Sequence, residues 1–259
     1  KLGMVYPLPE QLIRSFAAGV ERVVVAEELD PVLEEELRLM GIPCEGKAIF
    51  PLCGELDPTV VRKSAATFGL PVDKPPVALP ELPRPELPAR PPVLCAGCPH
   101  RGVFQLLSKK KVPVTGDIGC YTLGLLPPLS AIHTCGCMGA GIGVAHGAAK
   151  SGVGERMVAV IGDSTFYHAG LSALANIAYN KANVLTVILD NRTTAMTGHQ
   201  ANPGTGVTLQ QQPSEIIELE PLVRALGIHP VVTVDAYDVE GLERAYKELM
   251  SHQEPAVLV

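Results

Sequence analysis

An acidic residue and an amide follow two apolar runs of the sequence, where together they could bind a cation. Asp163 comes directly after the run 157–162, and Asn191 follows the run 184–189. A carboxylate and an amide oxygen are suitable ligands for Mg²⁺, which normally completes its octahedron with phosphate oxygens. Gly162 would let the backbone approach such a ligand closely. These residues predict a magnesium–diphosphate site.

The elements that must position this site form a β-α-β unit. Residues 157–161 and 184–189 are predicted to be buried strands, with a helix over 168–179 between them. Because the carboxyl ends of parallel strands share one edge of the sheet, where α/β folds bind ligands, the two polar residues should lie close together. Ser164 and Thr165 open the helix, where free N–H groups favour a diphosphate.

Two longer runs resemble a known family. Residues 162–171, and residues 189–204 with the sequence Leu-Asp-Asn-Arg-Thr-Thr-Ala-Met-Thr-Gly-His-Gln-Ala-Asn-Pro-Gly, are similar to the thiamine-diphosphate-dependent 2-oxoacid:ferredoxin oxidoreductases, and most similar to the large subunit of the indolepyruvate type. The resemblance implies that Asp163, Asn191 and the main-chain oxygen of Thr193 bind Mg²⁺. Further residues expected to line the cofactor groove are Thr194, Met196, Thr197, Gln200, Cys120 and Tyr121.

Seven cysteines occur in the chain, an odd number that argues against a disulfide framework. Cys95 and Cys98 form a Cys-x-x-Cys turn suited to zinc, an iron–sulfur cluster or a redox dithiol. Buried thiols without metal, or a zinc knuckle, are the alternatives to a cluster. Cys44 and Cys53 are expected to be ordinary thiols.

The cysteine pattern also carries the resemblance. Cys95 and Cys98, followed by Cys120, are similar to the proximal [4Fe–4S] ligands of the family, which implies that these three bind a cluster. The family's fourth ligand follows the last strand and is expected beyond Val259. Cys135 or Cys137 could replace it, or could line the cofactor pocket instead.

Four histidines are candidate proton shuttles, because imidazole titrates near neutral pH. They are His100, His133, His168 and His199. A histidine satisfied in the core or at the surface is the alternative at each position. His100 is the candidate catalytic residue because it closely follows the Cys-x-x-Cys turn.

Composition limits the remaining classes of function. The net charge of −6, without a basic cluster, argues against nucleic-acid binding. No apolar run approaches the roughly 18 residues that span a membrane, and no secretion leader is present, so we expect a cytoplasmic protein. The chain has no initiator Met and stops in an apparent strand, which suggests a fragment of a longer polypeptide.

The chain divides into three predicted parts. Residues 1–70 resemble the end of a small transketolase-C-terminal-like α/β domain, residues 71–93 are a proline-rich linker, and residues 94–259 form a parallel α/β domain that binds thiamine diphosphate. In the first part we expect a helix over 11–18, a strand over 21–28, and a helix with Asp30 as N-cap that ends at Gly41. Later elements are helices over 139–150, 215–226 and 239–250 and a strand over 231–234.

The resemblance implies oxidative decarboxylation of an aryl 2-oxoacid such as indolepyruvate, with coenzyme A as acyl acceptor, ferredoxin as electron acceptor and a smaller β subunit as partner. The glutamate that activates the cofactor belongs to a separate domain in this family, so residues 1–259 alone are expected to be inactive. The alternatives are a non-oxidative thiamine-diphosphate decarboxylase that uses Asp163 and Asn191 without a cluster, and a zinc-stabilised module without enzymatic activity.

Overall fold

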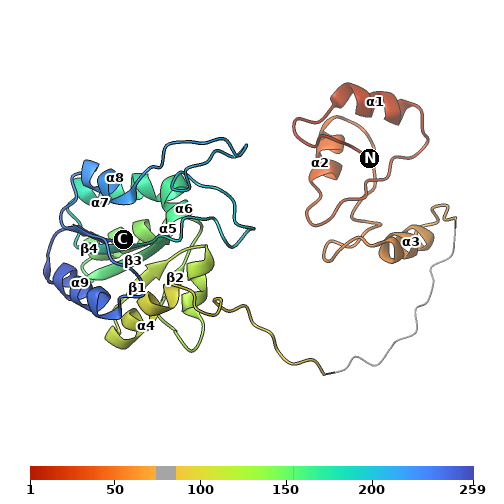
Figure 1. Cartoon of the computed structure of the whole chain (residues 1–259). Coiled ribbons are helices and arrows are strands. Elements are labelled where there is room, and N and C mark those ends of the chain that lie inside the picture. Colours follow the sequence, from red (N-terminus) through yellow and green to blue (C-terminus); the bar gives the residue numbers. More distant parts are fainter. Residues whose placement is uncertain (74–85, 154) are drawn as a thin grey trace. The chain divides into compact units, whose positions relative to one another are not determined.

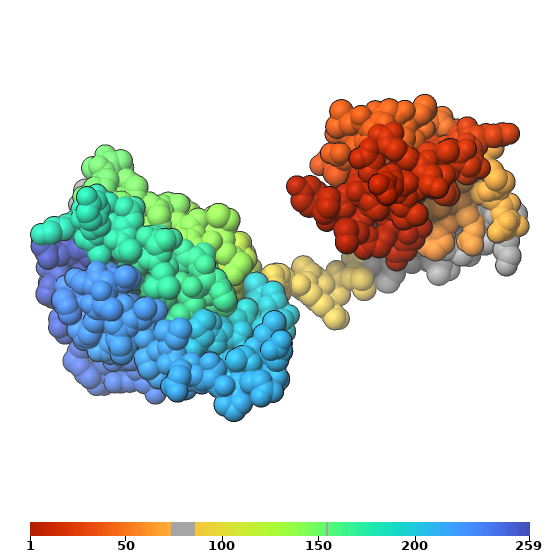
Figure 2. Space-filling model, turned by 90° about the horizontal axis from the view of Figure 1, so that it is seen from above, coloured from red at the N-terminus to blue at the C-terminus, as the bar shows by residue number. Residues whose placement is uncertain are grey.

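The structure is a computed structural model that describes residues 1–73, 86–153 and 155–259. Its contacts divide the chain into two compact units, Lys1–Leu87 and Pro88–Val259. The first unit runs from red to orange in Figure 1, and the second from yellow to blue. The same two groups of side chains are seen in the space-filling view (Figure 2). Part of the predicted linker, residues 74–85, lies outside the described residues.

The first unit contains the helices α1 (Glu10–Ala18), α2 (Val32–Leu39) and α3 (Pro58–Thr67). Residues of α1 and α2 contribute to a small apolar cluster. The predicted strand over 21–28 is wrong, because the pairing is confined to one parallel bridge between Val24 and Glu45. The segment then turns away from that partner. Glu27 instead accepts hydrogen bonds from the backbone N–H groups of Leu33 (2.8 Å) and Glu34 (3.0 Å).

This contact also corrects the start of α2. The predicted N-cap, Asp30, makes no side-chain cap, and Pro31 occupies the cap position. The carboxylate of Glu27 reaches the free N–H groups of the first turn from outside the helix, which satisfies the donors that a local cap would have served. Gly41 follows the helix with a φ of 78°, as expected for a residue that ends a helix.

The second unit is built on a parallel sheet, which confirms the predicted α/β fold. Its strand order is β2-β1-β3-β4-β6-β5. The bounds are β1 (Val114–Gly116), β2 (Thr134–Cys135), β3 (Met157–Gly162), β4 (Val184–Leu189), β5 (Val231–Val232) and β6 (Ala256–Leu258). Every residue of β3 and β4 is buried, as expected for central strands covered on both faces.

Helices cover the sheet. They are α4 (His100–Lys110), α5 (Ala140–Lys150), α6 (Asp163–Thr165), α7 (Leu171–Tyr179), α8 (Leu219–Ala225) and α9 (Val239–Ser251). Figure 1 shows α5 and α7 on one face and α4 and α9 on the other. Among the helices of the described ranges, none combines the length and apolar character needed to cross a membrane.

In the second unit, three predicted elements differ from those observed. The helix over 215–226 begins only at Leu219, because the N–H groups of Ser214 and Ile217 donate to carbonyls of the preceding loop. The strand over 231–234 is reduced to Val231–Val232. Between α6 and α7 the chain forms a π-helical turn, Phe166–Gly170, so the predicted helix over 168–179 is a composite element.

The order of the strands creates a crevice. From β1 the chain passes to β2 on one side, and then returns to β3 on the other side of β1. The connections that follow β1 and β3 therefore run in opposite directions and leave a crevice between them at the carboxyl ends of these strands. Ligands of α/β sheets bind in such a crevice. Residues after β1, β3 and β4 can therefore line one cavity.

Candidate functional site

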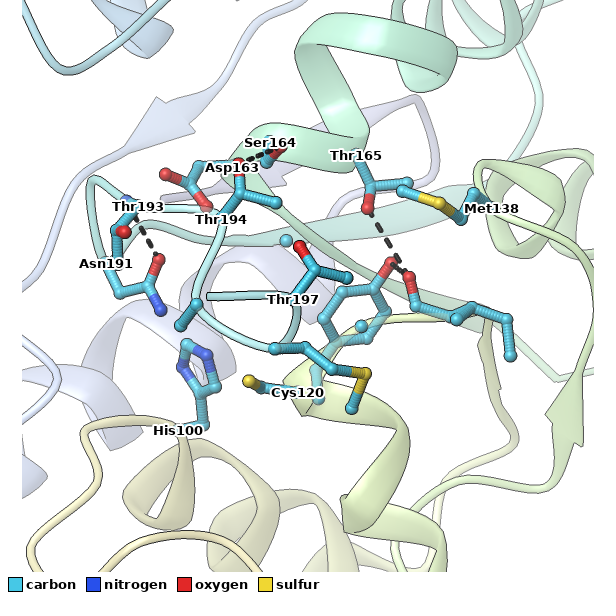
Figure 3. A pocket seen from close by; sticks show the side chains of 16 residues that line it. His100, Cys120, Met138, Asp163, Ser164, Thr165, Asn191, Thr193, Thr194 and Thr197 are labelled. Atoms are coloured by element: carbon cyan, nitrogen blue, oxygen red, sulfur yellow. Dashed lines mark hydrogen bonds between the residues drawn. The ribbon is translucent and has the colours of Figure 1, made fainter. Parts of the chain in front are cut away.

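A cavity lies at this edge of the sheet (Figure 3). Its walls come from the start of α4, the loop after β1, the β3–α6 junction and the loop after β4. The lining residues are His100, Ile118, Gly119, Cys120, Tyr121, Met138, Gly162, Asp163, Ser164, Thr165, Asn191, Thr193, Thr194, Ala195, Met196 and Thr197. The fold thus brings together His100 and the residues expected at the cofactor groove, apart from Gln200.

Asp163 is the buried acid of the cavity, with 3% of its surface exposed. Burial raises the pKa of its carboxyl group, and the side chain of Asn202, whose Nδ2 donates to Oδ2 over 3.0 Å, opposes that rise. An ionised carboxylate in such a place is unfavourable unless a positive group is bound beside it. A divalent cation would supply that charge.

Asn191 and Thr193 supply further oxygen atoms. The side-chain oxygen of Asn191 accepts a hydrogen bond from the N–H of Thr193 over 3.3 Å, which fixes the turn after β4. Figure 3 shows both residues next to Asp163. Carboxylate, amide and main-chain oxygens form a donor set that suits a hard cation such as Mg²⁺.

The loop after β4 is held against α6. Thr194 donates from its hydroxyl to that of Ser164 over 2.7 Å. The loop closes on itself because Thr194 and Gln200 exchange backbone hydrogen bonds, of 3.0 and 3.3 Å. Gln200 does not line the cavity; its side chain bonds to Thr197 instead. The predicted role of Gln200 in the groove therefore changes to support of the loop.

Tyr121 closes one side of the cavity. It is 3% exposed, and its hydroxyl donates to the fully buried carboxylate of Asp117. The other oxygen of Asp117 accepts from the N–H of Gly141 over 3.0 Å, at the start of α5. Burial raises the pKa of both side chains. Asp117 thus ties the loop that carries Tyr121 to a helix behind the sheet.

His100 is the first residue of α4 and is 4% exposed. Burial lowers the pKa of its imidazole to about 4, so the ring is neutral at neutral pH. Figure 3 shows the ring beside Asn191 and Cys120. The other candidate histidines, at 133, 168 and 199, do not line the cavity. His133 is a structural residue, since its Nδ1 accepts from the N–H of Val114 over 3.1 Å.

Of the cysteines, Cys120 lines the cavity. Its pKa is raised by burial first, and then by Cys98 and Cys95, so the three thiols lie close enough to interact electrostatically. Across the described ranges, however, no group of three His, Cys, Asp or Glu side chains could hold a single metal ion. That finding does not support a zinc knuckle. Cys135 and Cys137 are exposed, and the neighbouring Met138 lines the cavity in their place.

Comparison with known proteins decides the family. The model of the family described as "Thiamine pyrophosphate enzyme, C-terminal TPP binding domain" matches residues 117–259, which include most of the cavity. The chain belongs to this family.

The similarity to named proteins covers the whole chain and not only this domain. The chain is 40% identical over 288 residues to the indolepyruvate oxidoreductase subunit IorA of Pyrococcus abyssi, and 37% identical over 280 residues to that of Methanothermobacter thermautotrophicus. Each match covers 100% of this chain but only 44% of the relative, so the chain spans less than half the length of these proteins. The predicted likeness to the large subunit of this type is confirmed.

A solved structure has the same fold. The 2-oxoglutarate:ferredoxin oxidoreductase from Magnetococcus marinus superposes with a TM-score of 0.57 and 20% identity, covering 65% of this chain and 63% of that one. Like this thiamine pyrophosphate domain, it has an α/β fold.

The cavity fits the diphosphate end of such a cofactor. Asp163 is a buried carboxylate without a cationic partner in the described residues, with Asn191 and Thr193 beside it. Gly162 lets the Tyr121 ring pack against the end of β3, where a Cβ would collide with it. The cavity therefore offers the oxygen ligands that a metal diphosphate needs.

Sequence reasoning missed several residues of this thiamine pyrophosphate domain. Asn202 is buried and contacts Asp163, although its only signal is an Asn-Pro-Gly turn in the matching run. Asp117 follows β1 as Asp163 follows β3, a parallel that could have identified it. Ile118 and Met138 line the cavity without a chemical signal.

Proposed function

We propose that the protein containing this chain oxidatively decarboxylates an aryl 2-oxoacid of the indolepyruvate type. The products would be an acyl-coenzyme A and CO₂, with electrons passed to ferredoxin, and a smaller β subunit would complete the enzyme. The observation that carries this proposal is the 40% identity over the whole chain to a subunit named indolepyruvate oxidoreductase. The cavity around Asp163 gives that similarity a chemical basis.

In this proposal the metal is Mg²⁺, held by Asp163, Asn191 and the main-chain oxygen of Thr193. Ser164 and Thr165 lie at the same end of β3 and would face the diphosphate. Bound thiamine diphosphate supplies an electron sink for the decarboxylation. The chain's own contribution is to hold the diphosphate, to place Met196 and Thr197 along the groove, and to keep water out with the Tyr121 ring.

A [4Fe–4S] cluster would receive the electrons. We propose Cys95, Cys98 and Cys120 as three of its ligands, because Cys98 and Cys95 lie close enough to Cys120 to contribute to its raised pKa. A cluster separates its ligand sulfurs more widely than a single ion does, which accommodates three thiols that do not converge on one point. The fourth ligand is expected beyond Val259.

Metal analysis of the complete protein, purified without oxygen, tests the proposal. Iron, acid-labile sulfide and zinc are measured per chain in wild type and in Cys95→Ser. About four irons and four sulfides, lost in the variant, support an electron-transfer enzyme. Cys53→Ser is the matched control, since Cys53 is an exposed thiol of the first unit. An unchanged iron content in Cys95→Ser contradicts the assignment.

A second candidate is a non-oxidative decarboxylase that uses the same cavity. The observation in its favour is that Cys95 and Cys98, two of the three proposed cluster ligands, do not line the cavity. This enzyme would release CO₂ from the 2-oxoacid without reducing ferredoxin. One anaerobic assay that measures both CO₂ and reduced ferredoxin separates the two functions. If the same amount of CO₂ is released with and without ferredoxin, and an aldehyde is formed, the non-oxidative enzyme is favoured.

A further inference from the structure

The imidazole of His100 has no hydrogen-bond partner within the described residues, although the residue is only 4% exposed. Its ring nitrogens are not fully enclosed by protein, so they can reach a molecule in the cavity that the residue lines. A mostly buried polar group without a protein partner is satisfied by water or by a bound ligand. The missing partner of His100 is therefore expected in the cavity that its ring faces (Figure 3).

The position of this ring is fixed by the turn before α4. The guanidinium of Arg101 donates to the carbonyls of Leu94 (2.9 Å) and Cys95 (3.2 Å). From another part of the chain, the hydroxyl of Tyr237 donates to the carbonyl of Gly97 over 2.8 Å. The backbone on which His100 stands is thus held at three carbonyls.

The surroundings of the ring indicate what that partner is. In Figure 3 His100 lies on the side of the cavity occupied by Asn191 and Thr193, whereas Met138 lies on the far side. The polar side is where oxygen ligands for a metal gather. An imidazole has at least one N–H donor in either protonation state, so it can donate a hydrogen bond to an anionic oxygen.

We propose that His100 is a binding residue that donates its ring N–H to an oxygen of the diphosphate held in this cavity. The inference rests on the proposed function, because it takes thiamine diphosphate as the ligand. In this role His100 binds a phosphate oxygen, whereas the sequence suggested that it transfers a proton. Asp163 and Asn191 would bind the diphosphate through the metal, and His100 would bind it directly.

Calorimetric binding of Mg²⁺–pyrophosphate to the complete protein tests the proposal, since this probe lacks the thiamine rings. His100→Phe retains a ring but loses the donor, and we expect its affinity to fall about tenfold to a hundredfold, as for a hydrogen bond to a charged group. His100→Gln retains an N–H donor and should recover part of the loss. His229→Gln, at an exposed histidine outside the cavity, should bind as wild type does.

Each contrary result has a distinct meaning. Unchanged pyrophosphate affinity in His100→Phe overturns the inference, and if only the KM for the 2-oxoacid rises, the partner is the substrate instead. Wild type that fails to bind both Mg²⁺–pyrophosphate and Mg²⁺–thiamine diphosphate overturns the proposed function itself. If His100→Phe does not fold, the ¹⁵N-labelled ring of wild type decides: its N–H signal should move when Mg²⁺–pyrophosphate is added, and a signal that stays in place overturns the inference.

Discussion

The ring of Tyr121 lies against Gly162, so closely that a Cβ at position 162 would stand 2.8 Å from Cε1 of the tyrosine. Tyr121 follows Cys120, and Gly162 precedes Asp163. This contact therefore joins the loop that carries a candidate cluster ligand to the strand end that carries the candidate metal ligand. Because the tyrosine hydroxyl is bonded to buried Asp117, the ring has little freedom to retreat.

We expect Gly162→Ala to weaken both the fold and the cofactor site. The added methyl group must displace the Tyr121 ring, and overpacking of this kind costs about 1–3 kcal/mol. Chemical denaturation measures the loss, and calorimetry measures the accompanying fall in Mg²⁺–thiamine diphosphate affinity. The control is Gly143→Ala in α5, where a Cβ meets nothing within 4 Å; it should stabilise the domain by about 0.5–1 kcal/mol. Equal behaviour of the two variants would contradict the role of the contact.

Asp163→Asn should separate stability from binding. Burial raises the pKa of the Asp163 carboxyl group in the folded protein above the value of about 4 that it has in the unfolded chain. The stability that this group contributes is therefore fully present below about pH 4, and it is lost as the pH rises through the pKa of the folded state. Without Mg²⁺ the amide variant should therefore have the higher thermal midpoint at neutral pH, with the difference vanishing near pH 4.

The same variant should bind Mg²⁺–thiamine diphosphate at least about a hundredfold more weakly, because it removes the negative charge that Asp163 brings to the three proposed metal ligands. Thermal unfolding from pH 4 to 8 and calorimetry at neutral pH provide the two measurements. A variant less stable than wild type at neutral pH, or one with full affinity, would show that Asp163 is a structural acid.

Asn202→Ala removes the amide that donates to Asp163 over 3.0 Å. The pKa of Asp163 should rise further, because the hydrogen bond that opposes the effect of burial is lost. We expect Mg²⁺-dependent cofactor affinity to fall about tenfold to a hundredfold, as is typical when a partner of a metal ligand is removed. Asn180→Ala, at an exposed asparagine after α7, is the control. The prediction is refuted if Asn202→Ala and Asn180→Ala lower the cofactor affinity by the same factor.

Tyr121→Phe keeps the ring against Gly162 and removes only the hydroxyl. Buried Asp117 then loses one of its donors, which should lower the free energy of unfolding by about 1–3 kcal/mol. Tyr179→Phe, at a tyrosine that is 87% exposed, should change it by less than about 0.5 kcal/mol. Urea denaturation compares them, and a loss shared by both variants would point to a general effect of the substitution.

The centre of the domain was predictable from sequence because its signals are local. Residues 157–162 are apolar, and residues 184–189 are apolar apart from Thr186, as is typical of strands covered on both faces. Both strands formed as expected. Once these strands are parallel neighbours, Asp163 and Asn191 must share an edge of the sheet. The chemistry of the cavity follows from those two facts.

Other features depend on contacts between distant residues, which sequence patterns do not encode. Glu27 caps α2 from outside it, so Asp30, the residue with the right local signal, is not the cap. Asn202 reaches Asp163 only because the loop after β4 folds back over α6. Gln200 belongs to the recognisable run, yet its hydrogen bonds serve that loop rather than the cavity.

The π-helical turn Phe166–Gly170 determines how much the length of this region can vary. It separates Ser164 and Thr165, which line the cavity, from Leu174 and Ile177, which are fully buried in the core. A π turn holds more residues than an α turn, and removing one residue from a helix rotates all that follows by about 100°. Because the π turn already holds the extra residue, losing one residue here would convert it into an α turn and leave Leu174 and Ile177 in the core. Single-residue deletions should therefore be better tolerated in this turn than in α7, where each would rotate the residues that follow.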